Sequence, residues 1–548
     1  MADLEFPTVQ LEPGTLRTPA LRSRIVPGIG IDAAPLQVDC DHCTIHGRPL
    51  VSQHDWQEVL SSGQLGAVTG AFAIVWRHKG ETWLARDALG ERTLYFHHAP
   101  DGVIAGSTIR DLLQSANVPR QLSIDAIATY LIDAYLPGRL TMIAGIEEVL
   151  PGELVRIPAN GPIARTQIWE IPPEPREFSS ESTQVLELRR SLDQAIRRCL
   201  PDDCSLPIAA SLSGGLDSSL VLGLACRARP GEIASYSISF GTQYANELPF
   251  SSLMAAHCGS RHTIVEFTPE SIADGIAPTM AALSDPIGDP LTVPNALLFR
   301  YVSATSSVML NGEGGDPCFG GPKNLPMVLS ELYGPPTIRH KIQSYFRSHL
   351  KCFDDLPAML HSRIRDRYSQ ERLEASLLPH FENPRYQTLI TRLQAMNIQL
   401  KGGHHILPKV DALSRMSGML ARSPLFDRDV VEMSFRIPAQ GKLHGSVEKW
   451  RLKQAVSDVV PEAIRKRPKS GMLVPVEGWF QGPLLPIAKQ WLLDGLAKRD
   501  IIDRTYLERL LSHQLGGPRP RHGVKIWLLV ALEAWIQTHL GDGPISVV

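Results

Sequence analysis

A short polar loop between two apolar runs constrains the fold of this chain more than any other feature. Residues 211–219 read Ser-Leu-Ser-Gly-Gly-Leu-Asp-Ser-Ser, and they follow the apolar residues 206–210. Residues 220–226 are apolar throughout, which is typical of a helix buried behind a parallel strand. Further strands are predicted at 233–240 and 307–310. This order predicts a doubly wound α/β sheet that binds ligands at the carboxyl ends of its strands.

The same loop has the composition of an anion-binding site. Gly214 and Gly215 let backbone N–H groups point inward, the serine hydroxyls add donors, and the helix N-terminus adds positive potential. The loop differs from the common phosphate loop, whose spaced glycines and lysine are absent. Asp217 places a carboxylate among the phosphates, and this requires a cation, most simply Mg²⁺. The alternative is a Ser/Gly turn that only caps a helix.

A second glycine-rich loop follows the strand predicted at 307–310. Residues 311–321 read Asn-Gly-Glu-Gly-Gly-Asp-Pro-Cys-Phe-Gly-Gly. The glycines allow close approach of the backbone to a ligand, and Glu313 and Asp316 place two carboxylates at a strand end. The alternative is a tight turn with two solvated acids. Together the two loops favour one site for a pyrophosphate-containing ligand.

The composition limits the classes of protein that this chain can represent. Its 548 residues are enough for two domains, and 55 basic against 57 acidic residues argue against a nucleic-acid or anionic-membrane partner. We expect a cytoplasmic protein, because no apolar run is long enough to span a membrane and the start of the chain lacks a signal-peptide layout. Eight cysteines in a chain of this length do not indicate a disulfide framework. Cys40 and Cys43 form one C-x-x-C pair, but no second pair at zinc spacing accompanies them, which argues against a structural zinc site there.

At residues 213–219 the chain resembles the ATP-pyrophosphatase synthetases, which split ATP into AMP and pyrophosphate, and more closely the asparagine synthetase family. Residues 408–427 are similar to that family's K-x-D…R-x-P-F-L-D segment, and residues 448–472 to its E-K-x-x-L-R and R-x-K-x-G-F segments. The resemblance implies an N-terminal α+β glutaminase-like domain of the Ntn type, residues 1–175. It also implies a C-terminal ATP-pyrophosphatase domain with a doubly wound parallel sheet and helical additions, residues 176–548.

The resemblance also implies the residues of the site and its cofactors, ATP and Mg²⁺. Asp217 and Asp316 would hold Mg²⁺ on the pyrophosphate, Glu313 would lie by the acyl centre, and Lys469 would face the triphosphate. A cation there stabilises the charge that develops as the α-phosphorus is attacked. The implied ATP-binding set is Leu212, Ser213, Gly214, Gly215, Asp217, Ser218, Ser219, Ile238, Asn311, Gly312 and Lys449.

The N-terminal part departs from the glutamine-using members of the family. Residues 65–107 and 122–152 resemble their glutaminase domain. In those members a cysteine directly after the initiator Met is the nucleophile, and its own α-amine is the base. This chain has Ala2 there and lacks the stretches that hold glutamine. We therefore expect no glutamine hydrolysis, and the domain is either a structural remnant or a docking surface.

The C-terminal part departs from the asparagine-forming members at three positions, and Glu313 argues against the β-lactam-forming relatives. Pro317 stands where the family usually has Glu, and Glu313 stands where the β-lactam-forming relatives have Tyr. Arg415 and Leu420 replace a Met and a Glu of the asparagine-forming members. Loss of a carboxylate beside a pocket would remove the partner of a substrate ammonium, so free aspartate is a doubtful substrate.

The sequence thus predicts an ATP-dependent, AMP-forming carbon–nitrogen ligase. It looks most like the lasso peptide cyclases, which join a peptide's N-terminal amine to an Asp or Glu side chain, and this implies a precursor peptide as substrate and a leader peptidase as partner. The alternatives are a small-molecule amide synthetase that uses ammonia or another amine, and a catalytically silent scaffold. Residues 322–400 are predicted to be a solvated helical surface or a binding face for an acidic or peptide partner.

Overall fold

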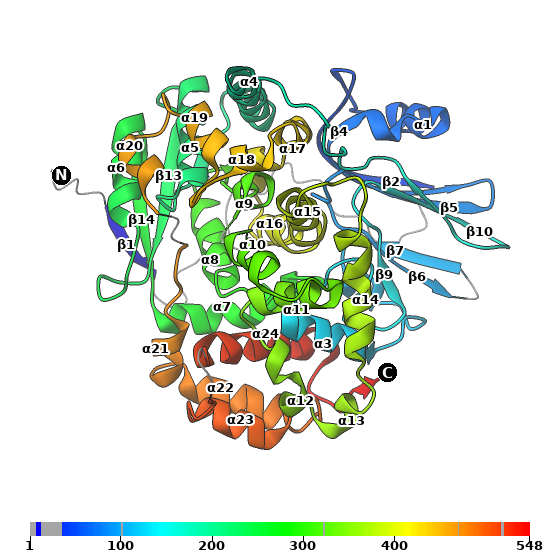
Figure 1. The fold of residues 1–548 in the computed structure, drawn as a ribbon. Helices are drawn as coiled ribbons and strands as arrows, with labels where there is room; N and C mark the ends of the chain where they lie inside the picture. The colour runs from blue at the N-terminus through cyan, green and yellow to red at the C-terminus, as the bar shows by residue number, and fades with distance from the viewer. Residues whose placement is uncertain (1–6, 12–34, 100–101, 322–323, 469–470, 517–519) are drawn as a thin grey trace.

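The computed structural model describes residues 7–11, 35–99, 102–321, 324–468, 471–516 and 520–548. A six-stranded sheet of the order β1-β14-β13-β12-β15-β16 forms the centre of the C-terminal part (Figure 1). All of its neighbouring strands are parallel. The strands are β1 (Thr8–Leu11), β12 (Ile208–Ser211), β13 (Ile233–Ser239), β14 (Arg261–Phe267), β15 (Val308–Leu310) and β16 (Leu420–Arg422). The predicted parallel sheet is therefore confirmed.

Helices cover both faces of this sheet, because successive residues of a strand point to opposite sides. On β12, Ala209 belongs to one hydrophobic core, whereas Ile208 and Ala210 belong to another. The first core also contains residues of α7 and α8, and the second contains residues of α4, α5 and α6. The sheet is thus doubly wound, as predicted. These helices are α4 (Glu181–Cys199), α5 (Leu216–Ala228), α6 (Leu248–Cys258), α7 (Pro269–Ala282) and α8 (Thr292–Val302).

Further helices, the predicted helical additions, build out the region between 315 and 540. They are α9 (Gly315–Phe319), α10 (Asn324–Tyr333), α11 (Ile338–Ser348), α12 (Leu356–Met359), α13 (Ser362–Arg365), α14 (Gln370–Phe381), α15 (Leu389–Met396), α16 (Leu407–Met416), α17 (Arg428–Phe435), α18 (Ala439–Lys442), α19 (Trp450–Ala455), α20 (Glu462–Lys466), α21 (Val476–Gln481), α22 (Leu485–Trp491), α23 (Arg504–Leu511) and α24 (His522–Leu540). A π-helical segment, Asn397–Ile406, joins α15 to α16. A short hairpin of β17 (Leu443–His444) and β18 (Val447–Glu448) precedes α19.

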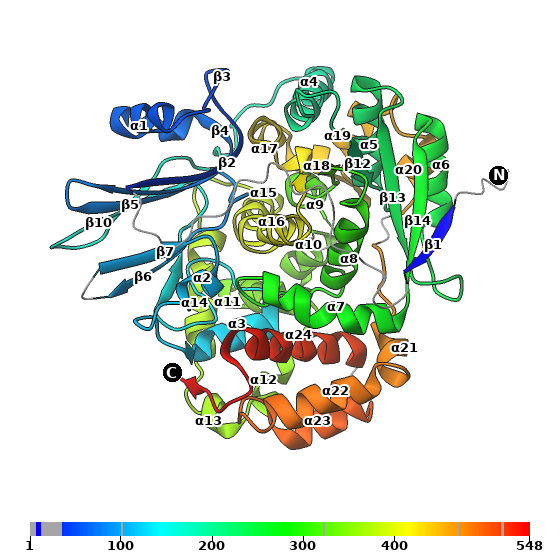
Figure 2. The ribbon, with the colours of Figure 1, turned by 180° about the vertical axis from the view of Figure 1, so that it is seen from behind.

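The N-terminal part contains two antiparallel sheets, seen from the other side in Figure 2. The larger has the order β11-β10-β5-β4-β2-β3 and the smaller β7-β6-β9. Three helices, α1 (Gln53–Ser62), α2 (Ile109–Leu112) and α3 (Ile124–Asp133), complete an α+β arrangement, as predicted. The strands are β2 (Leu36–Ile45), β3 (Arg48–Pro49), β4 (Val68–His78), β5 (Glu81–Arg86), β6 (Tyr95–Ala99), β7 (Gly102–Gly106), β9 (Ile146–Glu148), β10 (Glu153–Pro158) and β11 (Ala164–Gln167).

Both ends of the described chain cross between the two parts. Strand β1, close to the N-terminus, is an edge strand of the C-terminal sheet and pairs with β14. Near the C-terminus, β19 (Ser546–Val547) pairs with β8 (Gln121–Leu122) of the N-terminal part. The hydroxyl of Tyr130 on α3 also donates to the carbonyl of Leu528 on α24, at 2.8 Å. The boundary at residue 175 stays a prediction, and the first segment of the chain contributes to the second sheet.

Buried ion pairs hold the larger N-terminal sheet against the C-terminal part. Asp39 and Asp41 on β2 bind Arg415 and Arg422, respectively, and Asp411 binds both Arg415 and Arg92. The attraction of the neighbouring carboxylates outweighs burial and raises the pKa of Arg415. Removal of one partner from such a cluster leaves an uncompensated buried charge, so these contacts fix how the two parts meet.

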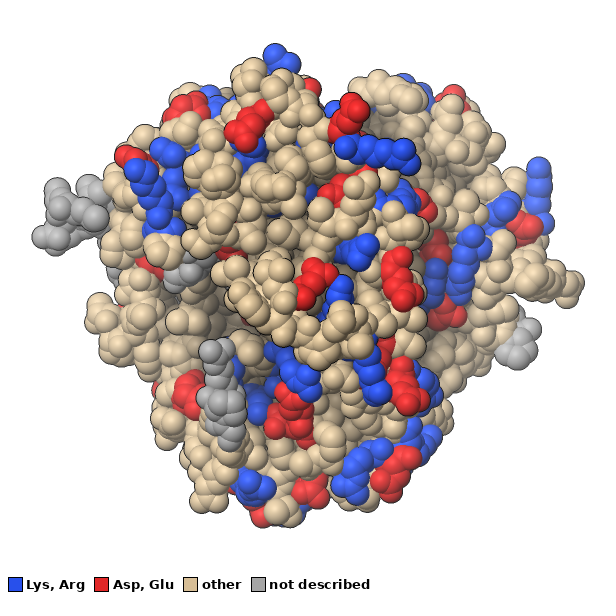
Figure 3. Space-filling model, viewed as in Figure 1, with Lys and Arg blue, Asp and Glu red and all other residues tan. Residues whose placement is uncertain are grey.

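The surface carries basic and acidic side chains interspersed over the face in Figure 3. This distribution matches the formal net charge of −2. In the described part of the chain, no helix combines the length and the apolar character that a bilayer crossing requires.

Candidate active site

The two glycine-rich loops meet at the carboxyl edge of the parallel sheet. Ala210 at the end of β12 pairs with Leu310 at the end of β15, so the loops that follow leave the sheet side by side. They border a cavity of about 270 Å³. Its predicted lining residues are Leu212, Ser213, Gly215, Asp217, Ser218, Ile238, Asn311, Gly312, Glu313 and Asp316. The sequence predicted one site for the two loops because parallel strands end at the same edge, and the family resemblance implied the individual residues.

The first loop folds back on itself through its serines. The Ser213 and Ser218 hydroxyls lie 3.0 Å apart, and Ser218 Oγ also accepts from the Ser213 amide at 3.1 Å. Gly214 has a φ of +82°, and a Cβ there would lie 2.7 Å from the carbonyl oxygen of Glu247. Glycine is therefore required at 214 for both conformation and space. The loop gathers hydroxyls and amides at the N-terminus of α5, which suits the phosphates of a nucleotide.

The second loop packs directly against the first. A Cβ on Gly312 would lie 2.5 Å from the amide nitrogen of Ser218, and one on Gly315 would overlap the carboxylate of Asp217. Asn311 is buried and shapes the turn: its Oδ1 accepts from the Glu313 amide at 3.0 Å. These glycines were predicted to let a ligand approach the backbone. In the structure they let the two loops pack against each other.

Lys449 bridges the two aspartates predicted to hold Mg²⁺. Its Nζ lies 2.5 Å from Asp217 Oδ2 and 2.5 Å from Asp316 Oδ1. The lysine side chain is only 4 % exposed. Burial acts to lower its pKa, but attraction to the two carboxylates outweighs burial, and the pKa of Lys449 is raised. The ammonium therefore stays charged and neutralises the aspartates.

The two aspartates fit the donor set that Mg²⁺ requires. Mg²⁺ binds oxygen ligands and is usually held in proteins by one or two carboxylates together with phosphates. Within the described structure, Asp217 Oδ1 is buried and has no hydrogen-bond partner. An unpartnered carboxylate oxygen at the mouth of a phosphate loop is a ready ligand. Asp217 and Asp316 would thus hold the ion, and Lys449 would be free to face the phosphates.

A second buried lysine, which the sequence analysis did not single out, lies near Glu313. Lys409 Nζ is 3.1 Å from Asp289 Oδ2 and 4.0 Å from Glu313 Oε1. The attraction of Asp289 and Glu313 outweighs burial, so the pKa of Lys409 is raised. Lys401 also lines the cavity. The K-x-D segment, in which Lys409 is the lysine, was the signal that could have identified it.

Four predicted residues do not line the cavity or lie outside the described structure, and Lys449, which contacts Asp217 and Asp316, is one of them. Gly214 and Ser219 do not line the cavity, and Ser219 is fully buried behind the loop. Lys469 lies outside the described residues. After it, Gly471 and Met472 line the cavity. The assignment of Lys469 to the triphosphate stays a prediction.

Arg415 and Leu420, which differ from the asparagine-forming pattern, do not line this cavity, whereas Pro317 does. Helix α16 presents Lys409 to the nucleotide-sized cavity, whereas Asp411 and Arg415 line a second cavity of about 440 Å³. Leu420 lies at the start of β16, far along the strand from the edge where the loops meet, and is not a lining residue of either cavity. Leu420 therefore does not contact either cavity, and no contact in the structure supports its expected effect on a substrate ammonium.

A doubly wound sheet with two glycine-rich loops at its carboxyl edge defines a nucleotide-binding α/β domain, and the family and relatives that match it make it an ATP-dependent carbon–nitrogen ligase. The family model described as asparagine synthase matches residues 187–537, and a glutamine amidotransferase domain model matches residues 58–169. The first match spans well over half of the chain, and the protein belongs to the asparagine synthase family.

Relatives of known name agree with this assignment at low identity. "Asparagine synthetase [glutamine-hydrolyzing] 1" of Bacillus subtilis is 23% identical over 497 residues, which cover 85% of this chain and 77% of that protein. "Carboxyethyl-arginine beta-lactam-synthase" of Streptomyces clavuligerus is 26% identical over 408 residues, which cover 74% and 64%. Among solved structures, an NH3-dependent NAD synthetase from Campylobacter jejuni is 13% identical and covers 39% of this chain and 92% of its own, with a TM-score of 0.20.

Proposed function

We propose that this ligase adenylates a carboxylate of a peptide and closes a macrolactam ring with the amine of the same peptide. The observation that carries the ligase chemistry is the bridge from Lys449 to Asp217 and Asp316. Holding a buried lysine between two partly buried carboxylates beside a phosphate loop costs desolvation energy, and a binding scaffold would not require this arrangement. The bridge therefore argues against a catalytically silent homologue.

The reaction has two steps, and this chain's residues have a role in each. In the first step, a carboxylate oxygen of the substrate attacks the α-phosphorus of ATP, the bond to the bridging oxygen breaks, and pyrophosphate leaves. Mg²⁺ held by Asp217 and Asp316 would neutralise the leaving pyrophosphate. Lys449 and the amides of the first loop add fixed positive charge where negative charge develops.

In the second step, the substrate amine attacks the acyl carbon of the adenylate, and AMP leaves with the bonding electrons. The amine must lose a proton as the amide forms. Glu313 is a carboxylate on the cavity wall, so we assign it this proton. Lys409 Nζ, 4.0 Å from Glu313 Oε1, attracts the carboxylate and helps to position it.

An exposed apolar stripe on α10 supports a peptide substrate. Leu325, Leu329, Leu332 and Tyr333 recur at helical spacing, and Leu332 and Tyr333 are 69 % and 85 % exposed. The helix begins eight residues after Asp316. Leu473, 67 % exposed, directly follows the cavity-lining Met472. A peptide could cover both surfaces, whereas ammonia or a free amino acid would use neither.

The test is pyrophosphate release from ATP and Mg²⁺ by the purified chain. The substrate panel contains leaderless and leader-bearing precursor peptides, aspartate with ammonia, and glutamine, and Asp217→Asn is the inactive control. Release with a peptide alone, together with loss of one water from its mass, is the expected result. Activity on the leaderless peptide only would support a leader peptidase as partner. Release with aspartate and ammonia would instead favour a small-molecule amide synthetase.

A further inference from the structure

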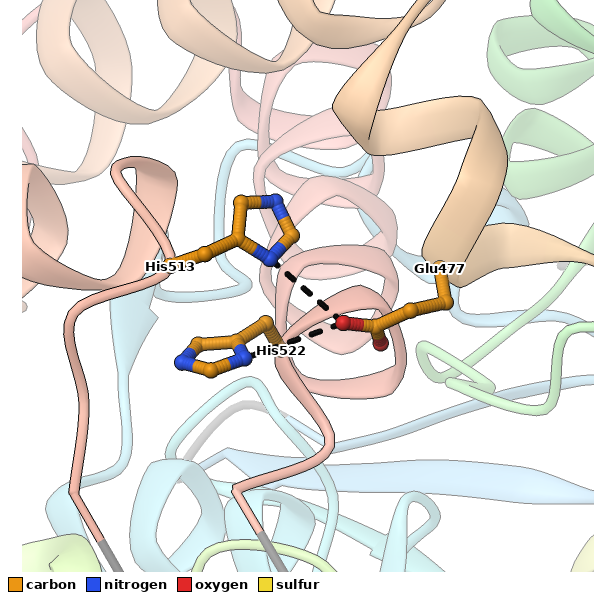
Figure 4. Close-up of side chains that lie close together, drawn as sticks. All are labelled: Glu477, His513 and His522. Atoms are coloured by element: carbon orange, nitrogen blue, oxygen red, sulfur yellow. Dashed lines mark ion pairs between the residues drawn. The ribbon is translucent and has the colours of Figure 1, made fainter.

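Three potential metal ligands converge outside the nucleotide cavity. Glu477 comes from α21, His513 follows α23, and His522 is the first residue of α24 (Figure 4). One ligand atom from each lies within 4.8 Å of the other two. Both imidazoles turn toward the same carboxylate in the close-up, although the two histidines belong to different segments. No sequence motif joins them.

The spacing of the donor atoms matches the edge of a metal tetrahedron. His513 Nδ1 is 3.4 Å and His522 Nδ1 is 3.7 Å from the same oxygen, Glu477 Oε1. Both distances exceed those of a hydrogen bond, about 2.7–3.2 Å. Two ligands bound to Zn²⁺ at about 2.0–2.1 Å with tetrahedral angles lie about 3.4 Å apart. The three groups thus leave space for an ion between them.

Apart from a hydrogen bond between the His522 ring and the backbone of Leu515, the buried histidine nitrogens have open positions. Within the described residues, both ring nitrogens of His513 and Nε2 of His522 are buried without a hydrogen bond. The ring centroids are 4.8 Å apart. Neutral imidazole is the form that binds a metal.

The carboxylate is held in place for this role. The amide of Gly523 donates to Glu477 Oε2 at 2.7 Å, which leaves Oε1 to face the histidines. A Cβ on Gly523 would lie 2.5 Å from the backbone of Glu477, so glycine permits the start of α24 to contact α21. Such an outer hydrogen bond orients a metal ligand before the ion arrives.

We propose that Glu477, His513 and His522 bind one Zn²⁺ ion, with a water molecule in the fourth position. Two imidazoles and a carboxylate at tetrahedral spacing are a donor set that zinc uses. The ion would fasten α21 to α24, and through α21 the segment 471–475, whose first two residues line the nucleotide cavity. The site is independent of the ligase chemistry, because none of its residues lines that cavity.

The experiment measures zinc binding by the full-length protein. After removal of metals by a chelator, zinc is titrated in competition with a chromogenic chelator, and thermal unfolding is followed with and without zinc. We expect one zinc per chain and a higher unfolding temperature with zinc. His513→Ala and His522→Ala should each weaken binding about 10- to 100-fold or more. The exposed His54 on α1 provides the matched control, His54→Ala, which should bind like the parent protein.

A variant that fails to fold is recognised by its circular dichroism without metal, and Glu477→Gln is then the milder substitution. Co²⁺ supplies a second readout, since tetrahedral Co²⁺ absorbs visible light strongly. Binding of Zn²⁺ that is equal in the parent, His513→Ala and His522→Ala proteins would overturn the proposal. The absence of Zn²⁺ binding by the parent protein would also overturn it, because the cluster is then only an ion pair.

Discussion

Replacement of Lys449 by methionine tests the charge arrangement at the active site. Without the ammonium, Asp217 and Asp316 face each other with no cation between them. Loss of one partner from a buried ion pair costs about 3–5 kcal/mol of folding free energy. Asp316 is 32 % exposed and partly solvated, so we expect the lower end, about 3 kcal/mol. Loss of a fixed positive charge from the transition state should also slow pyrophosphate release by about 10²- to 10³-fold.

Magnesium separates this explanation from simple misfolding. The Lys449 ammonium lies between the carboxylates proposed to hold the ion, so in Lys449→Met free Mg²⁺ should bind more tightly without ATP and recover most of the lost thermal stability. Thermal unfolding with and without Mg²⁺, and isothermal titration with Mg²⁺ alone, provide the measurements. The control is Lys489→Met on the exposed face of α22. If Mg²⁺ stabilises the parent and Lys449→Met equally, the two aspartates are not its ligands.

Three further predictions concern residues outside the loops. Burial lowers the pKa of Lys442 to about 7, so between pH 7 and 10.5 the lysine is protonated in the unfolded chain but not in the folded one. The free energy of unfolding should therefore rise with pH across that window. Urea unfolding should show this rise in the parent protein, and the Lys442→Met variant should lack it. Arg415→Met should lower stability by about 3 kcal/mol, because Asp39 and Asp411 lose a partner. If folded Arg415→Met releases pyrophosphate near the normal rate, the role of Arg415 is to hold the two parts of the chain together. A selective change in the substrate that the variant accepts would contradict this interpretation. Leu332→Ser with Tyr333→Ser should raise the KM for a peptide by about 10-fold or more and leave the KM for ATP unchanged; equal KM values for the peptide would exclude α10 from its binding.

The local parts of the site could be predicted from sequence because their signals are local. The loop at 213–219 combines an apolar strand, glycines at a turn and an apolar helix, and each of these is visible in nine or ten neighbouring residues. The second loop has the same property. Parallel pairing of β12 with β15 then follows from the general rule for α/β sheets. The predicted lining residues were found together for this reason.

The long-range contacts could not be predicted in the same way. Lys449 reaches Asp217 across 232 positions of sequence, and a lysine in such a stretch is ordinarily a surface residue. Lys409 lies on α16, and the pattern did not indicate which face of that helix meets the cavity. His513 and His522 are separated from Glu477 by two helices. Strand β1 joins the edge of a sheet formed mainly by residues 208–422, and edge pairing has no sequence period of its own.

The N-terminal sheet supports the second glycine loop through a continuous set of contacts. Asp41 on β2 accepts two hydrogen bonds from the Arg422 guanidinium, at 2.8 and 3.0 Å. The carbonyl of Arg422 in turn accepts from the Asn311 amide and from Asn311 Nδ2, both at 3.1 Å. Asn311 Oδ1 then accepts from the Glu313 amide. The N-terminal sheet is thus linked through Arg422 and Asn311 to the loop that carries Glu313, which is a structural reason for this chain to contain the sheet.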